Sequence, residues 1–269
     1  MATDAALGIK GIQEERQPGH WLLASLGKRV LRPGGRELTN WMLSRLAIGA
    51  NDRVVEFAPG MGATARQTLA AKPREYVAVE RDAAAAARMC RKLAAIGGDA
   101  VRCVENSADA TGLASASYSV VYGEAMLSLH TAEQKRRIIA EAARLLEPGG
   151  RYGIHELCLT PDEIDADSRR EISSVMSREI HVGVQPITSS EWRELLAEAG
   201  LRVVAESHAP MHLLEPRRLI ADEGLLGVAR IACNLARRPA ARARVKTMRR
   251  LFRKYTEQMG AIAFVAVKA

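Results

Sequence analysis

Aromatic side chains, cysteines and long apolar runs are all scarce in this chain of 269 residues. No apolar run approaches the roughly 18 residues of a bilayer-spanning helix, so we expect no transmembrane segment. The cysteines lie far apart without a Cys-x-x-Cys pair, which argues against a disulfide framework or a zinc site. Aromatic residues make up only 4% of the chain, which gives little support for the stacking surface of a nucleic-acid-binding protein.

The remaining composition is that of a globular protein. A hydrophobic content of 48% supports a core for one α/β domain with insertions, or for two small domains. The N-terminal segment contains Asp4, Glu14 and Glu15 and lacks the apolar core of a signal peptide, so we expect a cytoplasmic location. We expect no metal site, because the acids at 162–167 lie at the start of a predicted helix, where they complement its dipole.

The net charge of +8 is concentrated in one segment near the C-terminus. Between Pro216 and Lys254, twelve Lys and Arg residues accompany only two acids. Within 242–259 an apolar stripe at helical spacing predicts an amphipathic helix, through Val245, Met248, Phe252, Tyr255 and Met259. Three interpretations stay open: a helical cap with solvated charges, a surface for anionic lipid or an acidic substrate, and an RNA-binding face.

Strands and helices alternate through the middle of the chain, which indicates a parallel, doubly wound sheet. The expected strands are 53–57, 76–79, 101–104, 119–122 and 152–157, with helices at 63–71, 83–96 and 132–146. Two helices, at 21–31 and 38–46, precede them. The last third is predicted to contain helices at 165–180, 191–199 (capped by Ser189 or Ser190) and 225–235, and strands at 201–206 and 261–267.

The stretch from Val54 to Thr64 is the most informative local feature. A short apolar strand reaches Glu56 and runs into a turn that contains Gly60 and Gly62, followed by a helix start. Glycines let backbone N–H groups approach a ligand closely, because they tolerate positive φ. Glu80 ends the second strand about 20 positions past the glycines, where a carboxylate can accept hydrogen bonds from ribose hydroxyls. The pattern predicts a nucleoside-containing cofactor.

The acid at the end of the first strand decides between cofactors. A dinucleotide would bring a negatively charged pyrophosphate toward Glu56, whereas an ammonium or sulfonium group suits a carboxylate. The residues Glu56, Ala58, Gly60 and Gly62 resemble the first motif of the class I S-adenosylmethionine-dependent methyltransferases, Glu/Asp-x-Gly-x-Gly-x-Gly, with alanine at the first glycine. The resemblance implies S-adenosylmethionine as cofactor. It also implies an α/β, Rossmann-like, doubly wound seven-stranded sheet with an antiparallel last strand.

The resemblance also implies a domain organisation. It covers about residues 38–206 and the final strand, and the Glu147–Gly150 turn is typical of the family. We therefore expect an N-terminal helical segment at 1–40 and a methyltransferase domain at 41–269. Helical insertions at 158–188 and 214–258 are expected to form a cap over the acceptor.

The resemblance assigns residues to the cofactor, and two alignments stay open after the third strand. Asp109 is favoured for the contact with adenine because it is the only carboxylate in 106–109, but alignment on the following residues puts Ser107 there instead. The expected cofactor-binding residues are Glu56, Ala58, Gly60, Gly62, Glu80, Arg81, Ser107, Ala108, Asp109 and Glu124.

Candidates for chemistry follow the fourth and fifth strands, where the family brings the methyl donor and acceptor together. Glu124 and His155 are the candidate catalytic residues, since either type can remove a proton from an acceptor. His130, Glu156 and His181 are candidates for acceptor binding. The alternative for each is a hydrogen bond to neighbouring backbone, because many methyl transfers need alignment rather than a strong base.

We expect an enzyme that transfers the sulfonium methyl group to a small organic or lipid-like acceptor. An anionic membrane surface is a further expected contact, and nucleic acid is not favoured. Two alternatives remain: an RNA methyltransferase that uses the basic segment 216–254, and a cofactor-binding regulatory protein without activity. A nicotinamide dehydrogenase is a more distant one.

Overall fold

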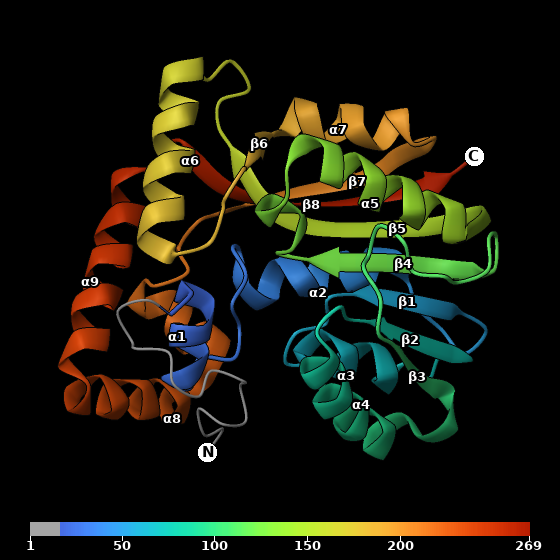
Figure 1. Ribbon diagram of the computed structural model, residues 1–269, viewed down its shortest axis with the longest axis horizontal. Coiled ribbons are helices and arrows are strands. Elements are labelled where there is room, and N and C mark those ends of the chain that lie inside the picture. The colour runs from blue at the N-terminus through green and yellow to red at the C-terminus, as the bar shows by residue number, and fades with distance from the viewer. Residues whose placement is uncertain (1–16) are drawn as a thin grey trace.

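The computed structural model describes residues 17–269, and the expectations for Asp4, Glu14 and Glu15 lie outside this range (Figure 1). Its centre is one sheet with the strand order β3-β2-β1-β4-β5-β8-β7. The strands are β1 (Arg53–Phe57), β2 (Glu75–Val79), β3 (Val101–Val104), β4 (Tyr118–Glu124), β5 (Leu146–Leu159), β7 (Leu201–Pro210) and β8 (Met259–Lys268). A two-residue strand, β6 (Ile187–Thr188), pairs with β5.

The direction of the strands confirms the expected fold. β1 pairs in parallel with β2 on one side and with β4 on the other, whereas β8 runs antiparallel to both β5 and β7. The chain order therefore reverses between β1 and β4, where Phe57 lies opposite Gly123. In open α/β sheets, ligands bind at the carboxyl ends of the strands beside such a reversal.

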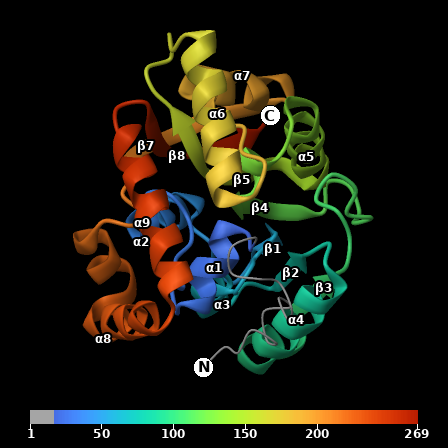
Figure 2. The same ribbon diagram turned by 60° about the vertical axis from the view of Figure 1, so that its left-hand side comes forward.

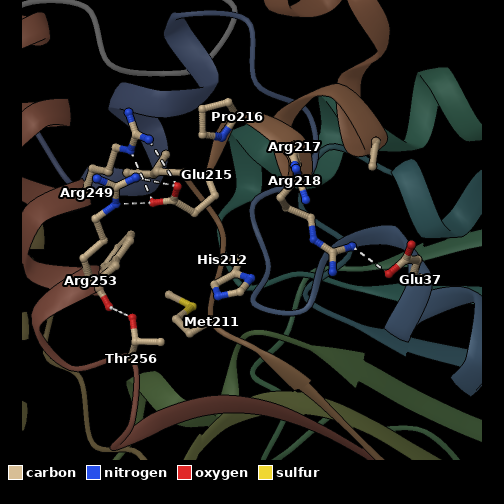
Figure 3. A pocket seen from close by; sticks show the side chains of 13 residues that line it. Glu37, Met211, His212, Glu215, Pro216, Arg217, Arg218, Arg249, Arg253 and Thr256 are labelled. Atoms are coloured by element: carbon tan, nitrogen blue, oxygen red, sulfur yellow. Dashed lines mark hydrogen bonds and ion pairs between the residues drawn. The ribbon is translucent and has the colours of Figure 1, made fainter.

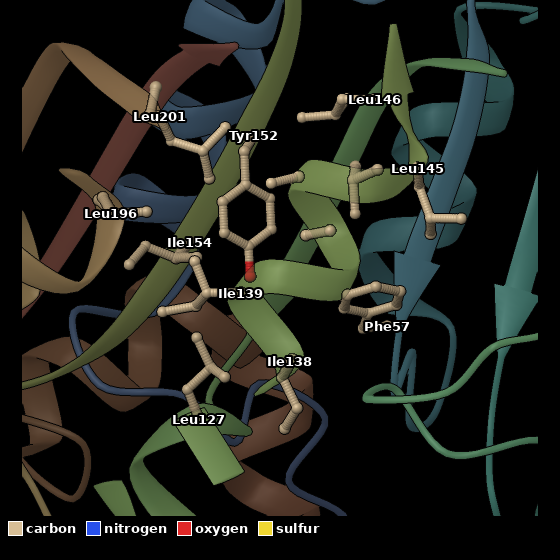
Figure 4. Close-up of a cluster of buried hydrophobic side chains, with 14 of the residues drawn as sticks. Phe57, Leu127, Ile138, Ile139, Leu145, Leu146, Tyr152, Ile154, Leu196 and Leu201 are labelled. Carbon is tan, nitrogen blue, oxygen red and sulfur yellow. The ribbon is translucent and has the colours of Figure 1, made fainter. Parts of the chain in front are cut away.

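Helices cover both faces of the sheet because the central strands are apolar on both sides. On one face, α5 (Ala132–Leu145) and α7 (Ser189–Glu198) pack on a cluster that includes Phe57, Ile154 and Leu196 (Figure 4). The other face carries α2 (Gly35–Leu46), α3 (Ala63–Ala70) and α4 (Ala83–Gly97). These two layers fix the carboxyl ends of β1, β2 and β4.

A third apolar cluster holds a helical cap at one end of the sheet. Its helices are α1 (Gly19–Ser25), α6 (Ala166–Ile180), α8 (Pro216–Arg237) and α9 (Pro239–Lys254), which gather on the left in Figure 1 and come forward in Figure 2. Leu157 and Leu159 of β5 and Met259 of β8 pack against them. The cap therefore lies on the ends of β5 and β8. No helix within residues 17–269 is both long and apolar enough to cross a bilayer.

Several element boundaries differ from the sequence-based expectations for identifiable reasons. The N-cap of α7 is Thr188, whose hydroxyl and Glu191 form a capping box, so Ser189 and Ser190 lie inside the helix. α9 ends at Lys254, and Met259 begins β8 instead of continuing the apolar stripe. β5 starts at Leu146 instead of the expected 152, because the strand includes the Glu147–Gly150 turn, at which the register of pairing with β4 shifts.

The helices around the expected boundaries also differ. α2 begins at Gly35, so the segment boundary expected at residue 40 falls within this helix. α8 is longer than the expected 225–235 and is interrupted at Gly224, which has φ 71° and ψ 168°.

Candidate active site

The turn after β1 has the backbone geometry that the sequence predicts. Gly60 and Gly62 have φ of 57° and 73°, and α3 begins directly after Gly62. A Cβ added to Gly60 would meet only the carbonyl oxygen of Ala58, at 3.9 Å, so a ligand has room to approach. Ala58 also has positive φ, at 48°, where the family has glycine. This conformation costs an L-residue about 1–2 kcal/mol.

Glu80 lies beside this turn on the neighbouring strand. The N–H of Ala58 donates to the carbonyl of Val79 at 2.9 Å, which links the ends of β1 and β2. The Glu80 carboxylate accepts from the N–H of Asp82 at 3.1 Å and is half-buried, whereas Arg81 is exposed. The structure thus brings Glu80 and the glycine turn to one edge of the sheet, as the sequence-based prediction of a nucleoside-containing cofactor requires.

The loop after β3 carries both candidates for the adenine end. The Ser107 hydroxyl donates to the Asp109 carboxylate, whose second oxygen lies 3.3 Å from Nε of Arg137 in α5. The Ser107 hydrogen bond, more than Arg137, holds the pKa of Asp109 below its usual range. Ala108 packs partly on the apolar cluster beneath α5. Asp109 is therefore tied to α5. Both alternatives for the contact with adenine, Asp109 and Ser107, remain predictions.

Glu56 lies in a different setting from the one expected. Its side chain is buried and accepts hydrogen bonds from the hydroxyls of Tyr76 and of Tyr122, the latter at 2.6 Å. Burial raises the pKa of Glu56 to about 7, although both tyrosine hydrogen bonds act in the opposite direction. With two tyrosines on the carboxylate, this geometry favours a supporting role beneath the turn over a direct bond to the ammonium of a ligand.

Glu124, at the end of β4, is the centre of a buried polar network. Its carboxylate accepts from the hydroxyls of Thr39, at 2.6 Å, and Thr64, and lies 3.0 Å from a guanidinium nitrogen of Arg32. Burial, the largest influence, would raise the pKa of Glu124, but Arg32 and His155 outweigh it and lower the pKa to about 2. A carboxylate with so low a pKa is a poor general base, so the geometry does not favour the catalytic role expected for Glu124.

His155 is fully buried and is bonded at both ring nitrogens. Nε2 lies 2.5 Å from the carbonyl of Pro33, and Nδ1 lies 2.9 Å from the Glu124 carboxylate. The carbonyl and the carboxylate thus engage both ring nitrogens, and neither nitrogen is left open to a ligand. With no exposed surface and no vacant acceptor nitrogen, His155 does not fit the role of a general base.

The residues expected to contact the acceptor mostly have structural partners. Glu156 is fully buried, and its carboxylate accepts from the N–H groups of Met126, Leu127 and Ser128. Glu156 therefore orders the loop after β4. Its enclosed side chain has no surface open to a methyl acceptor, contrary to the expectation. Nδ1 of His130 lies 2.8 Å from the Met126 carbonyl in the same loop, and His181 is exposed at the C-terminus of α6.

Three residues of this network were not expected from the sequence. Arg32, Thr39 and Thr64 come from the loop before α2, from α2 and from α3, and all three contact Glu124. The Arg-Pro-Gly-Gly string predicts only a helix break, because an arginine beside a turn carries no distinctive signal. Only the folded arrangement of α2 and α3 over β4 brings them together.

The α1 helix lies over the glycine turn. Met61 within the turn packs with Trp21, Ala24 and Leu31 around this helix. The loop after β4 contains a second strained alanine, Ala125, with φ of 52°. Positive φ at Ala58 and Ala125 therefore follows both strands at the reversal of strand order. Backbone strain of this kind is concentrated at functional sites.

A cleft of about 810 Å³ lies in the cap, apart from this edge (Figure 3). It is lined by α8 and α9, the segment after β7 and Glu37 of α2, and by none of the residues of the glycine turn. Glu215 is held by both Arg249 and Arg253, and Glu37 pairs with Arg218 at 3.1 Å. Both carboxylates of the cleft are already paired with arginines, and the cleft lies away from the glycine turn. We therefore do not assign the methyl-transfer reaction to it.

Comparisons with known proteins agree with the geometry. A family model described as a methyltransferase domain matches residues 54–150, which include the glycine turn, Glu80 and Glu124. An uncharacterized protein of Haemophilus influenzae is 30% identical over 250 residues, 93% of this chain and 96% of its own. The 27-O-demethylrifamycin SV methyltransferase of Amycolatopsis mediterranei is 37% identical over 89 residues, 32% of this chain and 30% of its own.

A solved structure shows the same fold. The phosphoethanolamine N-methyltransferase 2 of Haemonchus contortus, with phosphomonomethylethanolamine and S-adenosylhomocysteine, superposes with a TM-score of 0.70 at 15% identity. The match covers 97% of this chain and 59% of that one. With the matching domain, the strand order and the glycine turn beside Glu80, this chain belongs to the class I methyltransferases and is an S-adenosylmethionine-dependent methyltransferase.

Proposed function

We propose that this methyltransferase acts on a small organic or lipid-like acceptor beneath the helical cap. The observation that carries the proposal is the apolar interior of the cap, which rests on the ends of β5 and β8. Leu157, Leu159 and Met259 meet side chains of α1, α6 and α9 there. The expected insertions at 158–188 and 214–258 contain three of the four cap helices and would set the specificity for the acceptor.

The cofactor supplies a methyl group activated on a sulfonium centre, and the chain supplies its position. Gly60 and Gly62 leave room for backbone N–H groups to reach its amino-acid part. Glu80 would accept hydrogen bonds from the ribose hydroxyls. Glu124, held by Arg32, would fix the end of β4 beside the reacting groups.

The acceptor must supply its own nucleophile. Neither Glu124, with a pKa of about 2, nor the enclosed His155 is suited to remove a proton at neutral pH. Alignment in a site from which water is excluded then provides the rate enhancement. This favours acceptors with an acidic hydroxyl, an unprotonated nitrogen or an activated carbon. Two of the similar proteins are named for reactions on a rifamycin and on phosphoethanolamine, both small molecules.

The proposal is tested by measuring S-adenosylhomocysteine release with panels of phenols, amines and isoprenoid or phospholipid acceptors, and with transfer RNA as a separate arm. We expect turnover with a small acceptor that the Glu80→Ala variant loses and the Glu147→Ala variant keeps. Glu147 is exposed in the turn before the main part of β5, far along the chain from the glycine turn.

Two results would contradict the proposal. Methyl transfer to transfer RNA alone would assign the enzyme to RNA. Tight S-adenosylmethionine binding without turnover of any acceptor would favour a regulatory protein instead.

A further inference from the structure

Exposed apolar side chains are concentrated at the break in α8. Leu225 and Leu226 are 72% and 86% exposed, and Ile220, on the other side of the break at Gly224, is 44% exposed. Among residues 17–269, six large apolar side chains are exposed, and three of them lie in this short stretch. Two adjacent leucines so open to water are costly unless something covers them, because the transfer of apolar surface out of water is favourable.

The surrounding structure holds the leucines outward. Glu223 is buried, and its carboxylate accepts from the N–H groups of Arg29, at 2.8 Å, and Val30, at 2.9 Å. Gly227 is also buried, and a Cβ there would approach the Glu223 side chain to 2.8 Å. Glu223 and Gly227 are thus buried on either side of the break at Gly224, whereas Leu225 and Leu226 between them are exposed to solvent.

The same arrangement removes negative charge from the surface of α8 and α9. Asp222 and Glu223 are the two acids within 216–254, and both are buried near the ammonium group of Lys28. The exposed charged side chains that these helices contribute are therefore all cationic. Arg217 lies three positions before Ile220 and Arg230 four positions after Leu226, so each shares a helix face with an exposed apolar residue.

We propose that this surface, formed by Ile220, Leu225, Leu226, Arg217 and Arg230, docks on an anionic lipid bilayer. The leucines would enter the headgroup boundary while the arginines contact lipid phosphates, the usual arrangement of an interfacial helix. Cationic and apolar residues together favour a bilayer. A nucleic acid would use the arginines but not the leucines, and an apolar protein partner would not need the positive charge. The proposal is independent of the acceptor.

The test is flotation of the full chain with phosphatidylcholine vesicles that contain either no phosphatidylglycerol or about 30% of it. We expect binding to the anionic vesicles to exceed binding to the neutral ones by about tenfold and to fall with added salt. Leu225→Ser/Leu226→Ser should reduce binding about tenfold, and Arg217→Gln/Arg230→Gln should reduce only the part that depends on anionic lipid. The matched controls are Ile96→Ser/Val204→Ser and Arg91→Gln/Lys92→Gln, which change exposed residues elsewhere and should bind like the wild type.

Three outcomes would overturn the proposal. One is no preference of the wild type for anionic vesicles. Another is unchanged binding after loss of both leucines. The third is a dimer, measured by light scattering, that Leu225→Ser/Leu226→Ser converts to monomer without any vesicle binding, which would make a second copy the occupant.

Discussion

The guanidinium group of Arg32 lies 3.0 Å from the carboxylate of Glu124, which joins the loop before α2 to the end of β4. The cap holds the chain on both sides of Arg32, in this loop and in the first turn of α2. The Asp222 carboxylate accepts from the N–H of Arg36 at 3.0 Å, and Glu223 accepts from the N–H of Val30. One loop thus connects the cap helix α8 to the reversal of strand order, so disturbance of the Arg32–Glu124 pair should affect both stability and methyl transfer.

Glu124→Gln should destabilise the protein by about 3 kcal/mol, because it leaves the buried charge of Arg32 without its partner. Arg32→Gln should also destabilise it. The double variant should lose less than the two single losses together, since neither charge is then left alone. Urea unfolding of the four proteins measures this coupling. Strictly additive losses would show that the ion pair does not act as a unit.

The stability that Glu124 contributes should depend on pH in a defined direction. Its pKa is lowered from 4.5 to about 2 in the folded protein. The unfolded chain therefore takes up a proton first as the pH falls, and the stabilisation present above pH 4.5 is lost toward pH 2. The difference in unfolding free energy between the wild type and Glu124→Gln should shrink over this range. A constant difference would mean that the carboxylate is not the titrating group.

Glu56 should show the opposite dependence. Its pKa rises from 4.5 to about 7 on folding, so the folded protein keeps a proton that the unfolded chain releases. The resulting cost is absent below pH 4.5, grows as the pH rises to 7, and reaches about 3 kcal/mol. Relative to the wild type, Glu56→Gln should become more stable by about this amount between pH 4.5 and 8, whereas Glu147→Gln at an exposed position should not. Parallel curves for the wild type and Glu56→Gln would contradict the assignment.

The sequence predicts the backbone of this site better than its side-chain chemistry. Alternating strands, Gly60 and Gly62 predict the sheet and the turn, because apolar periodicity and positive φ are local properties. The roles of Glu56, His155 and Glu156 could not be predicted in this way. Each is defined by partners distant in sequence, such as Tyr122, Pro33 and Ser128, which only packing brings within hydrogen-bond distance. The buried acids of α8 are a similar case, since Lys28 lies almost 200 positions away.

Ala58→Gly should stabilise the protein by about 0.5–1 kcal/mol. Glycine adopts the φ of 48° found at this position without strain, although the greater freedom of the unfolded chain offsets part of the gain. The same change at Ala87, exposed in the middle of α4, should instead cost about 1 kcal/mol. Thermal unfolding of both variants measures the contrast, and a loss of stability at both sites would show that Ala58 is not strained.

The most direct test of the cofactor site is calorimetric titration of the wild type, Glu80→Ala and Glu147→Ala with S-adenosylmethionine and S-adenosylhomocysteine. If Glu80 holds the ribose, its removal should weaken binding of both ligands at least about tenfold, because charge-assisted hydrogen bonds contribute about 1.5–3 kcal/mol, while Glu147→Ala should bind like the wild type. An affinity of Glu80→Ala within about threefold of the wild type, a difference of less than 1 kcal/mol, would contradict the placement of the cofactor at the end of β2.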